Sequence, residues 1–192
     1  FRLINYEVPD GVNTIDLGGF TVKGPAARDG YAIIVPEGSE ITLTNGTIQS
    51  NYGGVKCLGS VTLESTLTLK SSGGIALDII GGSAVIDGAT VNMTSAQKYP
   101  TVRVQVSDDV PGKLVMNSGS IGMTFNGAVE SALSIEGGDV TINGGTVTST
   151  SSTAVFVGNS DLDNTADSIH GKLTVNDGSI IGVGGYALGG DN

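Results

Sequence analysis

The chain has one cysteine, no tryptophan, few aromatic residues and few charged ones. The single cysteine, Cys57, excludes an internal disulfide and any zinc site built from cysteines. Lysine and arginine together number 9 against 19 acidic residues, which gives a net charge of -10 and a pI near 4.2. Because nucleic acids and anionic membranes are bound largely through neutralisation of phosphate, we expect neither as a partner.

Long hydrophobic runs and recognisable targeting segments are also missing. No apolar stretch reaches the roughly 18 residues of a membrane span, and no signal peptide is visible. The chain opens on Phe1 and closes on Asn192 without a methionine start, so we expect a segment of a longer protein. Its 192 residues suffice for one domain, and a hydrophobic fraction of 39% is enough to build a core.

Glycine is abundant, with 31 residues, and one pattern recurs seven times along the chain. Each copy reads apolar, polar, apolar, then turn-like positions, then Thr or Ser followed by an aliphatic residue. Ile41-Thr42-Leu43 with Thr47-Ile48 is one example, and in the next copy the second half is displaced by one residue to Thr68-Leu69. The copies begin at residues 15, 41, 61, 84, 114, 140 and 173, a mean period of about 26 residues.

A second apolar stretch follows a Gly- or Ser-rich turn in each repeat. Its alternation with period two and its β-branched residues predict short strands, and no segment has helical periodicity. The second stretches are 31–35, 54–58, 75–79, 101–106, 132–135, 153–157 and 186–188.

A repeat of this length is too small to bury its own apolar face, so we expect the copies to stack. Gly, Asn and Asp at the corners suit the left-handed conformations of tight turns. A β-sandwich would not repeat one template in order, and a propeller blade needs about 40 residues. We therefore predict an all-β fold, a right-handed parallel β-helix (β-solenoid) of about seven coils. Residues 1–192 would form a single module, with the repeat region at 12–188.

Two inward columns are expected from this stacking. The first positions of the repeats form one column: Ile15, Ile41, Val61, Ala84, Leu114, Val140 and Leu173. The third positions form the other: Leu17, Leu43, Leu63, Ile86, Met116, Ile142 and Val175.

The phrases 14–22 (TIDLGGFTV), 140–147 (VTINGGTV) and 173–180 (LTVNDGSI) resemble the repeats of pectate-lyase-like right-handed β-helices. They are most similar to the catalytically silent Gly/Thr-rich versions found in bacterial surface proteins and in phage fibres and decoration proteins. The resemblance covers residues 12–188. It implies the fold, but the same scaffold serves lyases, hydrolases, adhesins and virion parts.

Catalysis on such a rod would require paired carboxylates on one face. Glu64 and Asp87 occupy the same template position in consecutive repeats and could lie about 5 Å apart, within the spacing of glycoside hydrolases. The alternative is an ordinary polar corner column, because Thr44, Asn117 and Asn143 share this position, as does Asn176. The outward acidic candidates on strands are Asp16, Glu64, Asp78, Asp87, Glu130 and Glu136.

A lyase would need a cationic base beside acidic calcium ligands, but Arg2, Arg28 and Arg103 belong to different repeats. Arg103 also has no acidic neighbour within its own stretch. The only histidine, His170, has no nucleophile in a recognisable setting, so no catalytic triad or metal-histidine site is expected.

The densest cluster of oxygen ligands lies in the segment 161–167. Asp161, Asp163 and Asp167 could contribute to a calcium site there. The segment lacks the glycine and final glutamate of an EF-hand loop, so a solvated insertion is the favoured alternative. We expect no other cofactor. Cys57 is expected in the core.

Four tyrosines near turns could stack on sugars or merely pack at the turn edges: Tyr31, Tyr52, Tyr99 and Tyr186.

We expect a non-enzymatic structural or recognition module on a virion appendage, such as a phage head fibre, decoration protein or tail fibre. The alternative is a bacterial cell-surface adhesin or carbohydrate-binding module. A third class is a polysaccharide-active hydrolase or lyase using Glu64, Asp87 and Asp16. The expected location is extracellular, on a virion or bacterial cell surface. The expected partners are a surface glycan or a virion or surface protein, without membrane insertion.

The two ends of the stack would expose apolar cross-sections and unpaired strand edges. No amphipathic helix precedes Ile15 or follows Leu188. We therefore expect further coils, a neighbouring domain or a partner subunit, including a second copy of the chain, at one or both ends.

Overall fold

The computed structural model describes residues 2–26, 30–95, 98–125, 127, 130–160 and 168–191. All regular elements in these residues are β-strands, and every pairing between two of these strands is parallel. The described part of the chain contains no helix, and hence none long and apolar enough to cross a membrane. The predicted all-β class is confirmed.

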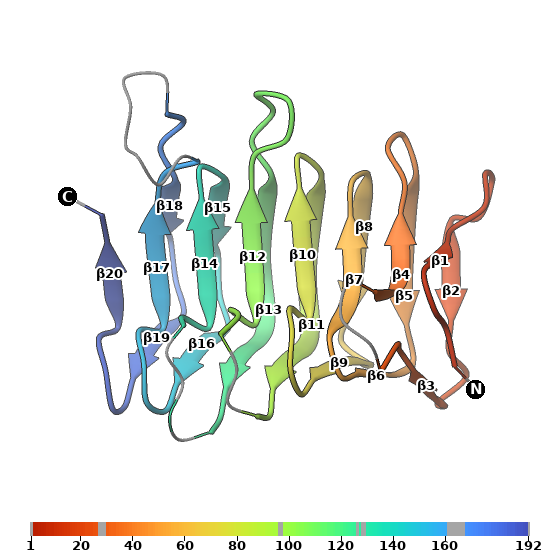
Figure 1. Cartoon of the computed structure of the whole chain (residues 1–192), viewed down its shortest axis with the longest axis horizontal. Helices are drawn as coiled ribbons and strands as arrows, with labels where there is room; N and C mark the ends of the chain where they lie inside the picture. Colours follow the sequence, from red (N-terminus) through yellow and green to blue (C-terminus); the bar gives the residue numbers. More distant parts are fainter. Residues whose placement is uncertain are drawn as a thin grey trace.

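The strands succeed one another along the long axis of the molecule, and the two termini lie at opposite ends (Figure 1). One sheet has eight strands in sequence order, each contributed by one of the second apolar stretches or, at its start, by residues near the N-terminus. Its members are β1 (Tyr6–Glu7), β4 (Tyr31–Val35), β7 (Gly53–Cys57), β10 (Leu77–Ile80), β12 (Val102–Gln105), β14 (Leu133–Glu136), β17 (Val155–Gly158) and β20 (Leu188–Gly190).

The other sheet has twelve strands, which form two parallel ladders joined through two long strands. The first ladder holds the first halves of the repeats: β2 (Thr14–Asp16), β5 (Glu40–Thr44), β8 (Ser60–Glu64), β11 (Ser83–Met93), β13 (Lys113–Met123), β15 (Asp139–Ile142) and β18 (Lys172–Val175). The second ladder holds their Thr/Ser halves, and it passes through the ends of β11 and β13: β3 (Thr21–Lys23), β6 (Gly46–Ser50), β9 (Leu67–Ser71), β16 (Thr146–Ser149) and β19 (Ser179–Gly182).

Glycine allows β11 and β13 to pass from one ladder to the other without interruption. Gly88 and Gly119 have φ values of 93° and 94°, in the left-handed region that favours glycine. The register of β11 shifts at the same place, where Asp87 and Gly88 both lie opposite Glu64 of β8. An extra residue on one strand of a pair is a β-bulge, which bends the strand.

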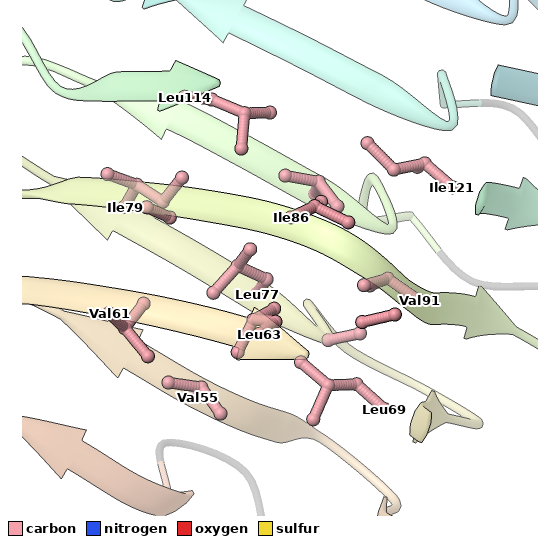
Figure 2. Packing of buried hydrophobic residues seen from close by; sticks show 14 of the residues in the cluster. Val55, Val61, Leu63, Leu69, Leu77, Ile79, Ile86, Val91, Leu114 and Ile121 are labelled. Atoms are coloured by element: carbon pink, nitrogen blue, oxygen red, sulfur yellow. The ribbon is translucent and has the colours of Figure 1, made fainter. Parts of the chain in front are cut away.

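Aliphatic side chains from both sheets fill the space between them. Figure 2 shows Val55 and Leu77 of the eight-stranded sheet packed with Val61, Leu63 and Ile86 of the twelve-stranded sheet. All five are fully buried. Burial of this kind is the main stabilising contribution of the fold, because each apolar side chain contributes about 1.5–3 kcal/mol when it leaves water.

The register predicted for the first halves is confirmed from the second repeat onward. Ile41 pairs with Val61, Val61 with Ala84, and the column continues through Leu114 and Val140. The one-residue displacement predicted at Thr68 is also present, since Thr68 pairs with Thr47 and with Thr90.

The register predicted for the first repeat is wrong by two residues. Ile15 pairs with Leu43, and Asp16 pairs with Thr44, whereas the template had aligned Ile15 with Ile41. The second halves nevertheless align as predicted, with Thr21 opposite Thr47. The first repeat therefore needs a longer turn, residues 17–20 against 45–46, and tandem glycines at φ 61° and 77° (residues 18 and 19) accommodate it.

Candidate binding site in a tyrosine-lined hollow

One row of residues on the outer face of the eight-stranded sheet carries most of its charge. Neighbouring strands place Lys56, Asp78, Arg103 and Ser134 in successive positions of one row. Their side chains alternate with the buried aliphatic residues of the same strands, so they project away from the core. The row thus brings an acid and a base together from different repeats.

Asp78 is fully buried even though it belongs to this outer row. Arg103 binds its carboxylate in a bidentate manner, with Nε donating to Oδ1 at 3.0 Å and Nη2 donating to Oδ2 at 2.9 Å. Gln105 Nε2 donates to Oδ1 at 3.2 Å, and the Tyr31 hydroxyl donates to Oδ2 at 2.5 Å. Four donors therefore replace the water that the buried carboxylate has lost.

The protonation states around Asp78 follow from these contacts. Burial raises the pKa of the Tyr31 phenol above its usual range, and the adjacent Asp78 charge and hydrogen bond raise it further. Burial alone would lower the pKa of Arg103, but hydrogen bonding to Asp78 and its negative charge raise that pKa instead. Tyr31 is therefore a neutral donor and Arg103 a fixed cation at physiological pH.

Tyr31 reaches Asp78 from two strands away by crossing over a glycine. A Cβ atom on Gly53 would lie only 2.5 Å from Tyr31 Cδ1, so no other residue fits beneath this ring. The backbone of Tyr31 is held by Asn5, which donates its N–H to the Tyr31 carbonyl at 2.7 Å and accepts the Tyr31 N–H on its side chain at 2.9 Å. The ring position is consequently fixed at both ends.

A hollow of about 180 Å³ lies next to the ion pair of Asp78 and Arg103. Three tyrosines and one arginine are among its lining residues: Tyr31, Tyr52, Tyr99 and Arg103. Three of the other lining residues are glycines, each directly before one of the second apolar stretches. The remaining lining residues are Gly30, Gly53, Gly74 and Ile75.

Buried hydroxyl groups fix the backbone on which the outer tyrosines are carried. Ser71 Oγ donates to the Tyr52 carbonyl at 2.9 Å and accepts the Gly74 N–H at 3.1 Å. Thr101, which is fully buried, donates to the Gly122 carbonyl at 3.0 Å. Hydrogen bonds to Ser71 therefore hold the backbone of two lining residues, Tyr52 and Gly74.

The predicted pair Glu64 and Asp87 is brought together as expected in register, since the two residues are partners on β8 and β11. Both side chains are exposed. Farther along the same corner, amide side chains form a ladder: Asn176 Nδ2 donates to Asn143 Oδ1 at 2.8 Å, and Asn143 Nδ2 donates to Asn117 Oδ1 at 3.0 Å. In this part of the corner the side chains form an ordinary column of polar residues, the alternative to a catalytic pair.

The other acidic candidates lie in different settings. Asp16 ends β2 and accepts hydrogen bonds from the Gly18 N–H at 2.7 Å and from Asn45 at 2.9 Å. Glu136 accepts a hydrogen bond from Ser134 at 3.0 Å. Glu130 was expected on a strand, but it lies in the turn before β14 and is exposed. Partial burial, followed by the charge of Glu136, raises its pKa.

The expectation that Asp78 is an outward acid is half correct, because its row faces outward while its carboxylate is covered. Arg103, for which no acidic neighbour was found within its own stretch, is paired with Asp78 of the preceding repeat. The same alignment that succeeded for the first halves would have revealed the pair: once Ile79 is aligned with Val104, Asp78 falls beside Arg103.

Arg2 and His170 are both exposed. The backbone of Arg2 forms an isolated parallel β-bridge with Lys23. His170 Nδ1 lies 2.6 Å from Asn159 Oδ1. Arg28 and the calcium candidates Asp161, Asp163 and Asp167 lie outside the described residues. Among the residues that are described, no group of three acidic, histidine or cysteine side chains could hold a metal ion.

Three of the four tyrosines singled out from the sequence line the hollow, whereas Tyr186 lies on the C-terminal side of β17 and is 77% exposed. Cys57 is buried in the core as predicted, and its thiol donates to the Ser83 carbonyl at 3.2 Å. Burial raises the pKa of this thiol to about 12.

Comparison of the chain with protein-family models, with curated proteins and with solved structures found no match.

Proposed function

We propose that this chain is a right-handed parallel β-helix of about seven coils that serves as a non-enzymatic structural and recognition module. Successive repeats contribute strands to both sheets, and strands of neighbouring repeats pair in parallel within each sheet. A chain that winds in this way forms one coil per repeat. The right-handed sense is favoured because crossovers between parallel strands are almost always right-handed.

The observation that carries the proposal is the unbroken parallel order of the eight-stranded sheet, from β1 to β20 (Figure 1). Parallel pairing of successive repeats makes a stiff rod with a regular side-chain spacing of about 4.8 Å. Such a rod suits a part that holds binding groups at a distance from a surface. We therefore favour a virion appendage, such as a phage head fibre, decoration protein or tail fibre.

A bacterial cell-surface adhesin or carbohydrate-binding module is the second candidate. The tyrosine-lined hollow favours it, because aromatic walls with a few fixed polar groups are typical of small-ligand sites. Both candidates place the chain outside a cell, with a surface glycan or a virion or surface protein as the partner. We propose no cofactor for either role.

A polysaccharide hydrolase is the less favoured candidate, even though Glu64 and Asp87 are partners in register. A glycosidase needs one carboxyl group that keeps its proton at neutral pH, and burial in an apolar pocket is the usual means. Both side chains are exposed to water and are not enclosed in such a pocket. We therefore assign them no catalytic role.

A glycan array probed with the purified chain, with and without calcium, tests the proposal when release of reducing ends is followed in parallel. We expect selective binding without cleavage. Cleavage that is lost in Glu64→Gln or Asp87→Asn would replace the proposal with an enzyme. Silence across the array would remove the recognition role. The sequence that flanks this segment discriminates the two favoured settings, since a secretion or wall-anchoring signal indicates an adhesin.

A further inference from the structure

We propose that the hollow bounded by Tyr31, Tyr52, Tyr99 and Arg103 binds a single neutral pyranose ring. This inference rests on the recognition function proposed above and names its ligand class and its site. Residues from four successive strands or the turns before them converge on the hollow. Its volume of about 180 Å³ is of the order of one sugar ring rather than of an oligosaccharide.

The aromatic walls supply the first half of the recognition. The face of a tyrosine ring carries partial negative charge, and the C–H groups on one side of a pyranose carry partial positive charge, so the two surfaces stack. Tyr99 is 39% exposed, which leaves part of its surface open to a ligand. Gly53 leaves room for the Tyr31 ring and Gly74 leaves room for the Tyr52 backbone, so these glycines allow both tyrosines to reach the hollow.

Arg103 supplies the polar contacts to the sugar, the second half of the recognition. A guanidinium group has five N–H donors in a fixed fork, and the hydrogen bonds to Asp78 use one on Nε and one on Nη2. The remaining donors can bind sugar hydroxyl oxygens. Because Asp78 and Tyr31 hold the group in place, little conformational entropy is lost when a ligand binds.

Charge favours a neutral sugar over an acidic one. Asp78 already neutralises Arg103, and Glu136 lies close enough to influence its pKa. The whole chain carries a net charge of -10, which repels an anionic ligand. A sugar carboxylate would therefore gain little from Arg103 and would meet an unfavourable field.

Saturation-transfer NMR with three methyl pyranosides, of the gluco, galacto and manno configuration, tests the site on the intact chain. We expect at least one of them to bind, and methyl β-D-glucuronide to bind more weakly than methyl β-D-glucoside, from which it differs only at C6. Tyrosine emission gives a second readout, because the chain has five tyrosines and no tryptophan. Failure of all three pyranosides to bind would overturn the proposed site.

Variants then locate the binding. We expect Tyr99→Ala and Tyr52→Ala each to weaken binding of the best pyranoside about tenfold, and Tyr186→Ala, a matched change at a tyrosine outside the hollow, to leave it unchanged. Circular dichroism confirms that each variant is folded. Undiminished binding by both hollow variants would overturn this site, while a positive glycan array would still support the recognition role. A silent array together with no pyranoside binding would overturn both.

Discussion

At the scale of single residues, the buried carboxylate of Asp78 has the largest consequences. It is covered by Tyr31, Arg103 and Gln105, and all four of its hydrogen bonds come from side chains. A buried charge with one partner removed is strongly destabilising, whereas a satisfied pair can be close to neutral in net stability. The pair therefore fixes the geometry of the hollow more than it stabilises the fold.

Asp78→Asn tests this interpretation. The amide would present hydrogen atoms to the guanidinium of Arg103, so we expect the free energy of unfolding in urea to fall by about 3 kcal/mol. The double variant Asp78→Leu with Arg103→Met should recover at least half of that loss, since no uncompensated charge remains. Glu64→Gln, at an exposed carboxylate, is the control and should change stability by less than about 0.5 kcal/mol. A similarly small change in Asp78→Asn would refute the interpretation.

Because the Cys57 thiol is buried with a raised pKa, we expect the protein to lose stability at alkaline pH. The pKa of this thiol is raised to about 12 in the folded chain, whereas the thiol of a cysteine in an unfolded chain has a pKa of about 8.5. The contribution is therefore fully present well below pH about 8.5, and above that pH it falls with a slope that approaches about 1.4 kcal/mol per pH unit. Urea unfolding at pH 7.5, 8.5 and 9.5, with reductant, should show this slope in the native chain.

Cys57→Ala removes the titrating thiol, so its unfolding free energy should depend less steeply on pH between 8.5 and 9.5. The comparison cancels contributions shared by both chains, including that of Tyr31, whose raised pKa acts above pH about 10. Equal slopes in the two chains would contradict the assignment of the effect to Cys57.

At the scale of elements, the bends of β11 and β13 depend on local backbone geometry. A Cβ atom on Gly119 would lie 2.3 Å from the Ala89 carbonyl oxygen of the neighbouring strand. Gly11 also has a positive φ, 80° against 94° at Gly119, but its Cβ position is open. The two glycines therefore separate the cost of conformation from the cost of close packing.

Alanine at both positions provides the test. Gly11→Ala carries only the left-handed strain, about 1 kcal/mol. Gly119→Ala adds a contact with a backbone that cannot move freely, so we expect a further loss of about 1–3 kcal/mol. Chemical denaturation measures both values, and equal losses would show that β13 can shift to relieve the contact.

Much of the strand architecture can be predicted from the sequence because one period repeats. Val61, Ala84 and Leu114 align as the template requires. The register of Ile15 could not be predicted, because a turn with tandem glycines changes length without altering the apolar pattern. The hollow could not be predicted from the sequence either, because Tyr52 and Tyr99 lie in turns, whose conformation does not follow from the period of the strands.

At the scale of the whole molecule, packing is uneven along the axis. The side chains of β8 that face the core are fully buried, whereas Val175 of β18 and Ile181 of β19 are each more than two-fifths exposed. At the opposite end Phe20 is 74% exposed beside an apolar hollow lined by Leu3, among others. Terminal strands have a neighbour on one side only.

This gradient predicts graded protection of backbone amides. Because each repeat is stabilised chiefly by its neighbours, local opening should begin at the two ends. We expect amides in β8 and the first half of β11 to exchange at least tenfold more slowly than those in β18 and β19. Hydrogen exchange followed by mass spectrometry measures these rates. Uniform protection along the chain would instead indicate a single cooperative unit.

The path of Tyr31 across Gly53 to Asp78 also constrains how the gene can change. A protein of stacked repeats can gain or lose a whole repeat by unequal recombination, since neighbouring strands present equivalent edges. Insertion of a repeat between β4 and β10 would separate the Tyr31 hydroxyl from its carboxylate, and insertion between β10 and β12 would leave Asp78 without Arg103. Lineages of this protein should therefore vary in repeat number on the C-terminal side of β12 and keep the segment from β4 to β12 intact.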